Sequence, residues 1–363
     1  MKRRAFLKTT TLAVGVATLS GCYKEEKIKS VNINRGKKVK LKLATSWPSH
    51  FPIMGTGVDE FAKRCLELSG GTLEIKVYPK NILVPALQVF DATSAGQIDI
   101  FHSGVYYWKG KNSAFSIFGG MPLGLLSDEM VTWLKFGGGM ELWRELYAKF
   151  NLYPLIGGST GPQMGGWFKK EIESLEDLKG LKMRIPGLGG EVMKRLGVNP
   201  ILIPAGEIYT ALERGTIDAT EWVGPALDIL MGFDRVAKYY YKGWHEPGSI
   251  LEITFNKARW DKLSSEHKAI IETSSDAMTA RMVEEFRYKN AEALQELIRK
   301  GVEIKSFPDE VVREAKEKLN GVLADESKRN PDFKRVLESY NRFVALNSPW
   351  SDISTKHILE IRG

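Results

Sequence analysis

Apolar and polar positions at the start of the folded chain switch between a strand period and a helix period. Residues 41–45 alternate with period two and predict a strand, whereas residues 58–68 carry apolar side chains at helical spacing. A strand at 73–78, a helix around 87–95 and a strand at 98–103 follow. This order of elements is typical of an α/β lobe with a βαβαβ core.

Residues 130–150 are predicted to be helical. A second set of such elements follows a strand at 153–158, which we expect to cross from the first lobe to another. Strands at 181–185 and 201–203 flank a helix at 191–196, and this pattern predicts a second α/β lobe. A strand at 249–256 is expected to cross back to the first lobe.

Helices are predicted for the last hundred residues. Ser264 is a suitable N-cap for a helix that continues to about Lys300 without a proline, roughly 55 Å at 1.5 Å per residue. We expect it to lie across both lobes as a spine. Further helices begin at Pro308, and their last part is apolar at Phe343, Leu346, Trp350 and Ile353. This tail can cover the spine or contact a second subunit.

The chain contains an internal repeat of domain size. Residues 208–220 repeat residues 89–101 at a constant offset of 119. Gly215 is expected to end a helix in a left-handed conformation, and a short buried strand is expected at 217–222. Two such units indicate two similar lobes, with a ligand between their strand ends. The matched pairs are Phe90 and Tyr209, Ala92 and Ala211, Gly96 and Gly215, Ile98 and Ile217, and Asp99 and Asp218.

Residues 1–21 have the features of an export signal, with basic residues followed by an apolar and small-residue run at 12–19. Residues 3–8 (R-R-A-F-L-K) resemble a twin-arginine signal. Leu19-Ser20-Gly21-Cys22 resembles a lipobox, in which Cys22 would carry lipid and anchor the protein to a membrane. Residues 22–38 are polar and aperiodic, and they predict a tether.

Composition excludes several classes of protein. The net charge is +8, but four of the positive charges lie in the export signal, so nucleic acid is not an expected partner. Beyond the signal, no run of about 20 apolar residues predicts a membrane span. If Cys22 carries lipid, Cys65 is the remaining cysteine and the chain has no disulfide. Stability must then come from the core.

Polar side chains at strand ends are candidates for a site, because ligands of open α/β sheets bind where strands end. Glu221 and Trp222 end the strand expected at 217–222. Arg184 lies near the end of strand 181–185, and its guanidinium fork matches a carboxylate. Taken alone, each also fits a structural role, as a solvated glutamate, a core tryptophan or a surface arginine.

Two loops add further candidates. Gln163 is the only long polar side chain in the glycine-rich loop 160–168, and Tyr107 lies in the aromatic loop 103–111 that follows a strand. His245 has no histidine or cysteine partner at zinc-ligand spacing, which argues against a zinc site.

Several long motifs in order resemble the extracytoplasmic solute-binding proteins of tripartite ATP-independent periplasmic (TRAP) transporters, the DctP-like family. The similarity is to the branch that binds 2-oxo acids or lactate with a metal ion, and it covers about residues 41–353. The motifs are G-P-Q-M-G-G-W-F at 161–168, D-L-K-G-L-K-M-R-I-P-G-L-G-G-E-V at 177–192, E-I-Y-T-A-L-E-R-G-T-I-D-A-T-E-W-V-G-P at 207–225 and G-W-H-E-P-G at 243–248.

The resemblance implies a two-lobed α/β fold of the type II periplasmic-binding-protein style, with crossing strands and a long spine helix. Lobe I is expected at 39–157 plus 250–263, and lobe II at 158–249. The spine helix is expected at 264–301. The C-terminal helical region at 302–363 is expected to be a possible dimer contact, because this helix can be exchanged between subunits in the family branch.

The resemblance also implies roles for residues. Arg184 would bind the ligand carboxylate, with Gln163, Trp222 and Tyr107 as further ligand contacts.

A metal ion, Na⁺ or Ca²⁺, would be held by Glu221, the Trp222 carbonyl, Gln163 and Glu246. A hard cation among these oxygens would favour acids with a second oxygen beside the carboxylate and reject simple fatty acids.

The expected function is therefore capture of a small 2-oxo or 2-hydroxy monocarboxylate of the pyruvate, 2-oxobutyrate or lactate type, and its delivery to a membrane permease. One alternative keeps the fold and binds a sugar acid or dicarboxylate without metal. Another is an exported enzyme acting on organic acids. The chain lacks a G-x-S-x-G, H-E-x-x-H, dinucleotide or C-x-x-C motif where one would be needed, so an enzyme is not expected.

Overall fold

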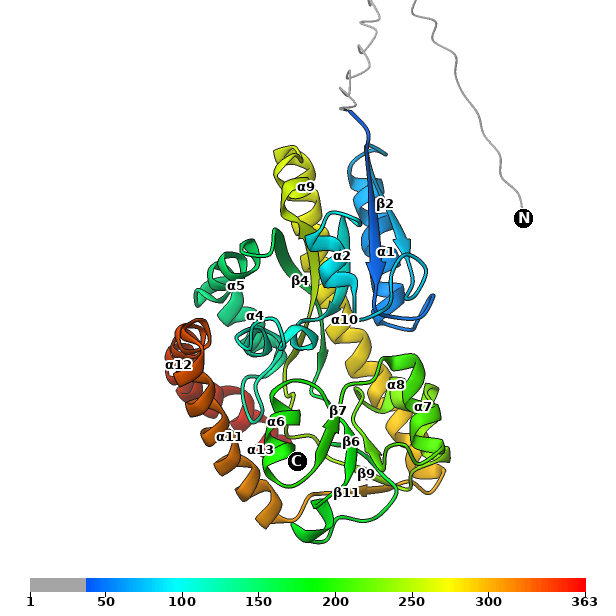
Figure 1. Cartoon of the computed structure of the whole chain (residues 1–363), viewed down its shortest axis with the longest axis vertical. Coiled ribbons are helices and arrows are strands. Elements are labelled where there is room, and N and C mark those ends of the chain that lie inside the picture. The colour runs from blue at the N-terminus through cyan, green and yellow to red at the C-terminus, as the bar shows by residue number, and fades with distance from the viewer. Residues whose placement is uncertain (1–36) are drawn as a thin grey trace, which may run out of the picture. The chain divides into compact units, whose positions relative to one another are not determined.

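Two separate β-sheets form the framework of the protein (Figure 1). The structure, a computed structural model, describes residues 37–363, so the expected export signal and the expected lipid site at Cys22 lie outside the described residues. The first sheet has the strand order β2-β1-β3-β10-β4, and the second has the order β11-β9-β5-β8-β6-β7. We call the first sheet and its helices lobe I, and the second sheet and its helices lobe II.

The strands of each sheet come from distant parts of the chain. Lobe I contains β1 (Val39–Thr45), β2 (Leu73–Tyr78), β3 (Ile100–Gly104), β4 (Leu152–Gly161) and β10 (Ser249–Asn256). Lobe II contains β5 (Gly166–Phe168), β6 (Lys182–Arg184), β7 (Asn199–Ile201), β8 (Ala219–Thr220), β9 (Tyr239–Tyr241) and β11 (Glu303–Lys305). In lobe I, β1 pairs parallel with β2 and β3, and antiparallel β10 lies next to β3. In lobe II, β6 pairs parallel with β7 and β8, and antiparallel β5 lies next to β8.

The internal repeat is confirmed as a structural repeat. Gly96 and Gly215 both have left-handed backbones, with φ of 76° and 74°. Asp99 Oδ2 accepts a hydrogen bond of 2.8 Å from a backbone N–H of β1, and Asp218 Oδ2 accepts one of 2.9 Å from the backbone of β6. Each aspartate therefore fastens its own strand to the central parallel strand of its lobe.

Two predicted elements have different bounds in the structure. The strand expected at 217–222 is only Ala219–Thr220, because the Glu221 N–H makes a last bond of 2.9 Å to the Arg184 carbonyl and the chain then leaves the sheet. The helix expected at 130–150 is two helices, α4 (Ser127–Phe136) and α5 (Gly139–Ala148), because Gly138 between them has a φ of 84°.

The chain crosses between the lobes as predicted, from β4 into β5 and from β9 back into β10. The long helix is α10 (Ser265–Arg299), and the Ser264 hydroxyl accepts a bond of 3.1 Å from the His267 N–H. It packs against α1 (Met54–Leu68) and β4 of lobe I and against α8 (Pro225–Leu230) of lobe II. No helix in the described part of the chain is long and apolar enough to cross a bilayer.

The C-terminal helices also contact both lobes. Helix α11 (Asp309–Arg329) packs against α6 (Gly187–Arg195), and α12 (Pro331–Ser351) packs against α4 and α5 (Figure 1). Helix α12 also packs against the short helix α3 (Phe115–Gly119). The remaining helices are α2 (Val89–Ser94), α7 (Ala205–Glu213), α9 (Lys257–Asp261), α13 (His357–Arg362), the short helices η1 (Val105–Trp108), η2 (Glu176–Leu178) and η3 (Phe233–Arg235), and the π-helical turn η4 (Asp352–Lys356).

A buried histidine joins three segments of lobe I. The Trp47 indole N–H donates to His102 Nδ1 at 2.7 Å, and His102 Nε2 lies 2.7 Å from the Gly157 carbonyl oxygen. Burial lowers the pKa of His102 to about 4, against the opposing effect of the Gly157 bond. The neutral ring therefore accepts at Nδ1 and donates at Nε2.

Stability should fall at mildly acidic pH because of His102. The unfolded chain binds a proton at this residue below about 6.5, and the folded chain does so only near 4. The stabilisation is therefore present above pH 6.5 and is lost as the pH falls to 4, by an amount on the order of 3 kcal/mol. Urea unfolding between pH 7.5 and 4 measures it. His102→Gln, which keeps an acceptor and a donor without titrating, should show a shallower pH dependence, and equal slopes would refute this role.

Candidate functional site

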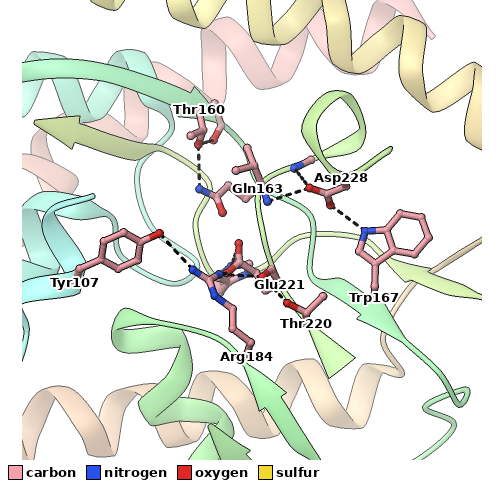
Figure 2. A network of polar contacts seen from close by, with 12 residues as sticks. Tyr107, Thr160, Gln163, Trp167, Arg184, Thr220, Glu221 and Asp228 are labelled. Carbon is pink, nitrogen blue, oxygen red and sulfur yellow. Dashed lines mark hydrogen bonds and ion pairs between the residues drawn. The ribbon is translucent and has the colours of Figure 1, made fainter. Parts of the chain in front are cut away.

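An arginine and a glutamate pair in the interior where two strands of lobe II end. Arg184 is the last residue of β6 and Glu221 directly follows β8, and both are 1% exposed. Arg184 Nη1 donates to Glu221 Oε2 at 2.8 Å and to the Glu221 carbonyl oxygen at 2.9 Å. Both hydrogens of this nitrogen are thus directed to Glu221, and the pair fixes the orientation of the guanidinium plane (Figure 2).

The opposite edge of the Arg184 guanidinium is less well paired. Its Nη2 is 3.3 Å from the Tyr107 hydroxyl oxygen (Figure 2). Its Nε is 3.4 Å from the Ile203 carbonyl oxygen. Both contacts are longer than a typical hydrogen bond of about 2.9 Å. The Trp222 ring lies against the same group, with its centroid 5.1 Å from the guanidinium carbon. A planar two-oxygen acceptor could therefore take this edge in a defined orientation.

Gln163 and Glu246 bring additional oxygens to the site. Gln163 is 3% exposed, and its amide nitrogen donates to Thr160 Oγ1 at 3.1 Å, which turns the amide oxygen away from Thr160 (Figure 2). The Gln163 N–H donates to the Glu246 carbonyl oxygen at 3.0 Å, so these two segments lie side by side. Glu246 is 4% exposed.

Three buried oxygens in this cluster have no hydrogen-bond donor in the described structure: Gln163 Oε1, Glu221 Oε1 and Glu246 Oε2. Buried polar atoms are normally paired, so three unpaired acceptors mark a place for a positively charged or donating ligand. Carboxylate and amide oxygens are the ligands that Na⁺ and Ca²⁺ take in proteins. The residues present therefore fit a hard cation.

Histidine, cysteine and acidic side chains alone do not make this a metal site. Among residues 37–363, no three of these side chains are grouped so that they could hold an ion. A cation here would need the amide oxygen of Gln163 and backbone oxygen in addition to the two carboxylates.

The electrostatics agree with a missing positive charge. Burial, and then repulsion from Glu221, raises the pKa of Glu246 well above its usual value. Burial opposes the charged form of Arg184, but Tyr107, Glu221 and other acidic groups around it raise its pKa. Arg184 therefore stays charged, and the carboxyl groups of Glu221 and Glu246 share its positive charge.

Lobe I covers the site with aromatic side chains. Tyr107 comes from η1, and burial raises its pKa to about 12, so it remains a neutral hydroxyl. Trp47 and Phe51 make edge contacts with Trp222, at centroid distances of 6.2 and 6.5 Å. Their contact with Trp222 joins lobe I to the loop after β8.

Comparison with known proteins assigns the chain to a family. Residues 43–329 match the family described as bacterial extracellular solute-binding protein, family 7, or DctP. The chain belongs to this family. It is 38% identical over 358 residues to a monocarboxylate 2-oxoacid-binding periplasmic protein of Nostoc sp., covering 98% of this chain and 97% of that one.

Two crystal structures of TRAP periplasmic solute-binding proteins are similar over nearly their whole length. The protein from Colwellia psychrerythraea, with bound calcium and pyruvate, is 40% identical with a TM-score of 0.86. The protein from Pseudoalteromonas atlantica, with bound sodium and pyruvate, is 39% identical with a TM-score of 0.87. Each comparison covers 89% of this chain and 99% of the other. These similarities confirm the predicted two-lobed α/β fold and identify a TRAP solute-binding protein.

The structure brings together all six residues that the sequence of this TRAP solute-binding protein nominated, which are Tyr107, Gln163, Arg184, Glu221, Trp222 and Glu246. Sequence reasoning missed Tyr106, whose pKa burial and then Glu246 raise, and it set aside His245. The His245 ring is fully buried, and its Nε2 lies 3.7 Å from Glu221 Oε1.

Asp228 was also missed, and it holds the loop that carries Glu221 and Trp222. Its Oδ2 accepts from the Trp167 indole at 2.9 Å (Figure 2) and from the Tyr240 hydroxyl at 2.8 Å. Its Oδ1 accepts from the Val223 and Gly224 N–H groups at 3.2 and 3.0 Å. A detectable sequence feature is its position in the first turn of a helix that begins with Gly-Pro.

Asp228→Ala should destabilise this solute-binding protein strongly. It removes the acceptor of four donors, two of which are backbone N–H groups at the start of α8. We expect a loss of about 3 kcal/mol in urea unfolding. Asp325→Ala, at a half-exposed aspartate of α11, is the control and should change stability by less than about 0.5 kcal/mol. A loss at Asp228 no greater than in the control would contradict the assignment.

Proposed function

We propose that this TRAP solute-binding protein captures a small 2-oxo or 2-hydroxy monocarboxylate, of the pyruvate, 2-oxobutyrate or lactate type, together with Na⁺ or Ca²⁺. The acid is then delivered to the TRAP membrane permease. The similar structures that contain pyruvate with calcium or with sodium support this choice of ligand.

One observation carries the proposal. The same buried cluster has a guanidinium edge without full pairing and three acceptor oxygens without donors. The guanidinium edge of Arg184 suits a carboxylate. The oxygens of Gln163, Glu221 and Glu246 suit a cation, which when bound attracts the second oxygen of the acid. Tyr107 and Trp222 then line the ligand from the two lobes.

The alternatives differ in what they require. A sugar acid or dicarboxylate bound without metal leaves the three acceptor oxygens to be filled by ligand hydroxyls. An exported enzyme would need a nucleophile or base next to the bound acid. In the proposed reading the protein binds and releases its ligand unchanged, so saturable binding without turnover over a panel of organic acids separates the two classes.

The export route is part of the same proposal. A twin-arginine signal at residues 1–21 would carry the protein out of the cytoplasm, and lipid at Cys22 would anchor it. The support is the sequence of that segment together with the periplasmic family.

Arg184→Lys should weaken binding of pyruvate at least about 30-fold, because truncating a buried, hydrogen-bonded charge pair costs roughly 2–5 kcal/mol. Lysine keeps the charge but cannot present a fork to a carboxylate. Calorimetric titration measures the loss. Arg195→Lys is the matched control, since Arg195 is a partly exposed arginine of lobe II paired with Asp325. Affinity near that of the wild type in Arg184→Lys would rule out the carboxylate role.

The same titration tests the cation. Removal of calcium and sodium should weaken pyruvate binding in the wild-type protein, and Gln163→Ala should raise the cation concentration needed for half-maximal binding. Binding that is indifferent to cations would favour the metal-free alternative.

We also propose a homodimer through the C-terminal helices. Leu346, Trp350 and Ile353 are 77%, 65% and 69% exposed, and Phe343 next to them is buried against lobe I. An apolar stretch this exposed is typical of an interface.

Replacing Trp350 and Ile353 with serine should convert a dimer to a monomer, since it removes two large apolar side chains from the contact. Light scattering coupled to size exclusion measures the mass. Leu230→Ser, at an equally exposed leucine of α8, is the control. A wild-type protein that is monomeric at micromolar concentration would exclude this contact.

A further inference from the structure

The short helix η1 of lobe I brings Tyr107 and the following Lys109 to charged side chains of lobe II. Tyr107 reaches Arg184, and Lys109, which follows η1, forms an ion pair with Glu191 of α6. Gly104 and Gly119 leave room for the Tyr106 ring, because a Cβ at either would lie within 3.0 Å of it. The position of this turn therefore decides whether Tyr107 can meet Arg184.

One buried carboxyl group anchors the turn to its own lobe. Glu252 lies on the crossing strand β10 and has no exposed surface. Its Oε1 accepts from the Trp108 indole N–H at 2.7 Å and from the Tyr147 hydroxyl at 3.2 Å. The Thr254 hydroxyl donates to its Oε2. Three donors from η1, α5 and β10 thus meet at one side chain.

Packing alone does not require this carboxyl group. The Trp108 ring already contacts Phe90 and Phe101, at centroid distances of 5.3 and 5.8 Å. Burial raises the pKa of Glu252 to about 8, which shows that its charged form is unfavourable there. An apolar residue of similar size would fill the space, but it would leave the indole N–H and the two hydroxyl groups without an acceptor and would not fix the rotation of the indole.

We propose that Glu252 is a positioning residue for acid binding. Its carboxyl group holds the Trp108 indole, and through Trp108 it holds the turn that presents Tyr107 to Arg184. Glu252 itself touches neither Arg184 nor the three unpaired oxygens, so it acts only through η1. The effect on affinity rests on the proposed function, whereas the placement of Tyr107 does not.

A double-mutant cycle tests the proposal by pyruvate titration in saturating CaCl₂. Glu252→Met keeps the volume without an acceptor and should weaken binding about tenfold, whereas Glu252→Gln keeps an acceptor and should stay within about twofold of the wild type. In a Tyr107→Phe background, Glu252→Met should have an effect of less than about twofold, because the contact it supports is already gone. An equal loss in both backgrounds, or affinity near that of the wild type in Glu252→Met, would overturn the proposal.

Trp108→Phe keeps an aromatic ring and removes only the indole donor. It should reproduce the tenfold loss, and it serves where Glu252→Met does not fold, as judged by circular dichroism and thermal unfolding. Unchanged affinity in a folded Trp108→Phe protein would also overturn the proposal.

A second readout needs no ligand. In protein labelled with 3-fluorotyrosine, the ¹⁹F resonance of Tyr107, assigned through Tyr107→Phe, should move in Trp108→Phe and Glu252→Met and stay in place in Glu252→Gln. Tyr209, in lobe II, is the control. A Tyr107 resonance that moves in neither variant refutes the role of Glu252. If the wild type binds no pyruvate with calcium, the proposed function fails, and this measurement still decides the role of Glu252.

Discussion

The buried pair of Arg184 and Glu221 is the constraint on which the site depends. Transferring two charges from water to the interior is unfavourable unless geometry and extra hydrogen bonds compensate. Here one nitrogen of Arg184 donates two hydrogen bonds to Glu221. Asp228 accepts hydrogen bonds from two backbone N–H groups of the loop that follows Glu221 and so fixes that loop. The guanidinium is therefore already oriented in the protein itself, and this would lower the ordering cost of binding the proposed acid.

The structural repeat explains why lobe II holds the charges. At the offset of 119, Glu221 corresponds to His102 of lobe I. Arg184 pairs in register with Thr220, as Ala44 pairs with Phe101, so Ala44 occupies the place of Arg184. Lobe I thus has a small apolar residue and a neutral, fully bonded histidine where lobe II has an ion pair. The two lobes therefore share a topology but differ at the site: lobe II supplies the charged side chains, and lobe I supplies the aromatic side chains that cover them.

The sequence predicted the two lobes, the crossing strands and the long helix because their periodic patterns are local. The six nominated residues came from strand ends and from motifs shared with a family. Asp228 could not be found in this way, since its partners Trp167 and Tyr240 are brought to it only by the fold. Glu252 could not be found either, because the polarity of its strand alternates and this pattern predicts that one face is exposed. In the structure all eight residues of β10 are buried. Helices α3, α4 and η1 cover one face of the sheet at β10, and α10 covers the other face at the neighbouring strand β4.

The buried acids can be sorted by how many donors reach their oxygens. Asp228 and Glu252 have donors on both oxygens, all from the protein itself, and they hold structure in place. Glu221 and Glu246 each keep an oxygen without a donor, and Arg184 is the one guanidinium among them. A monocarboxylate would add a further negative charge to this cluster. With both glutamates ionised, the negative charges of Glu221, Glu246 and the acid and the positive charge of Arg184 sum to about −2. Ca²⁺ would neutralise this net charge, and Na⁺ would halve it. In the proposed function, the charge balance of the site would therefore couple capture of the acid to capture of a cation.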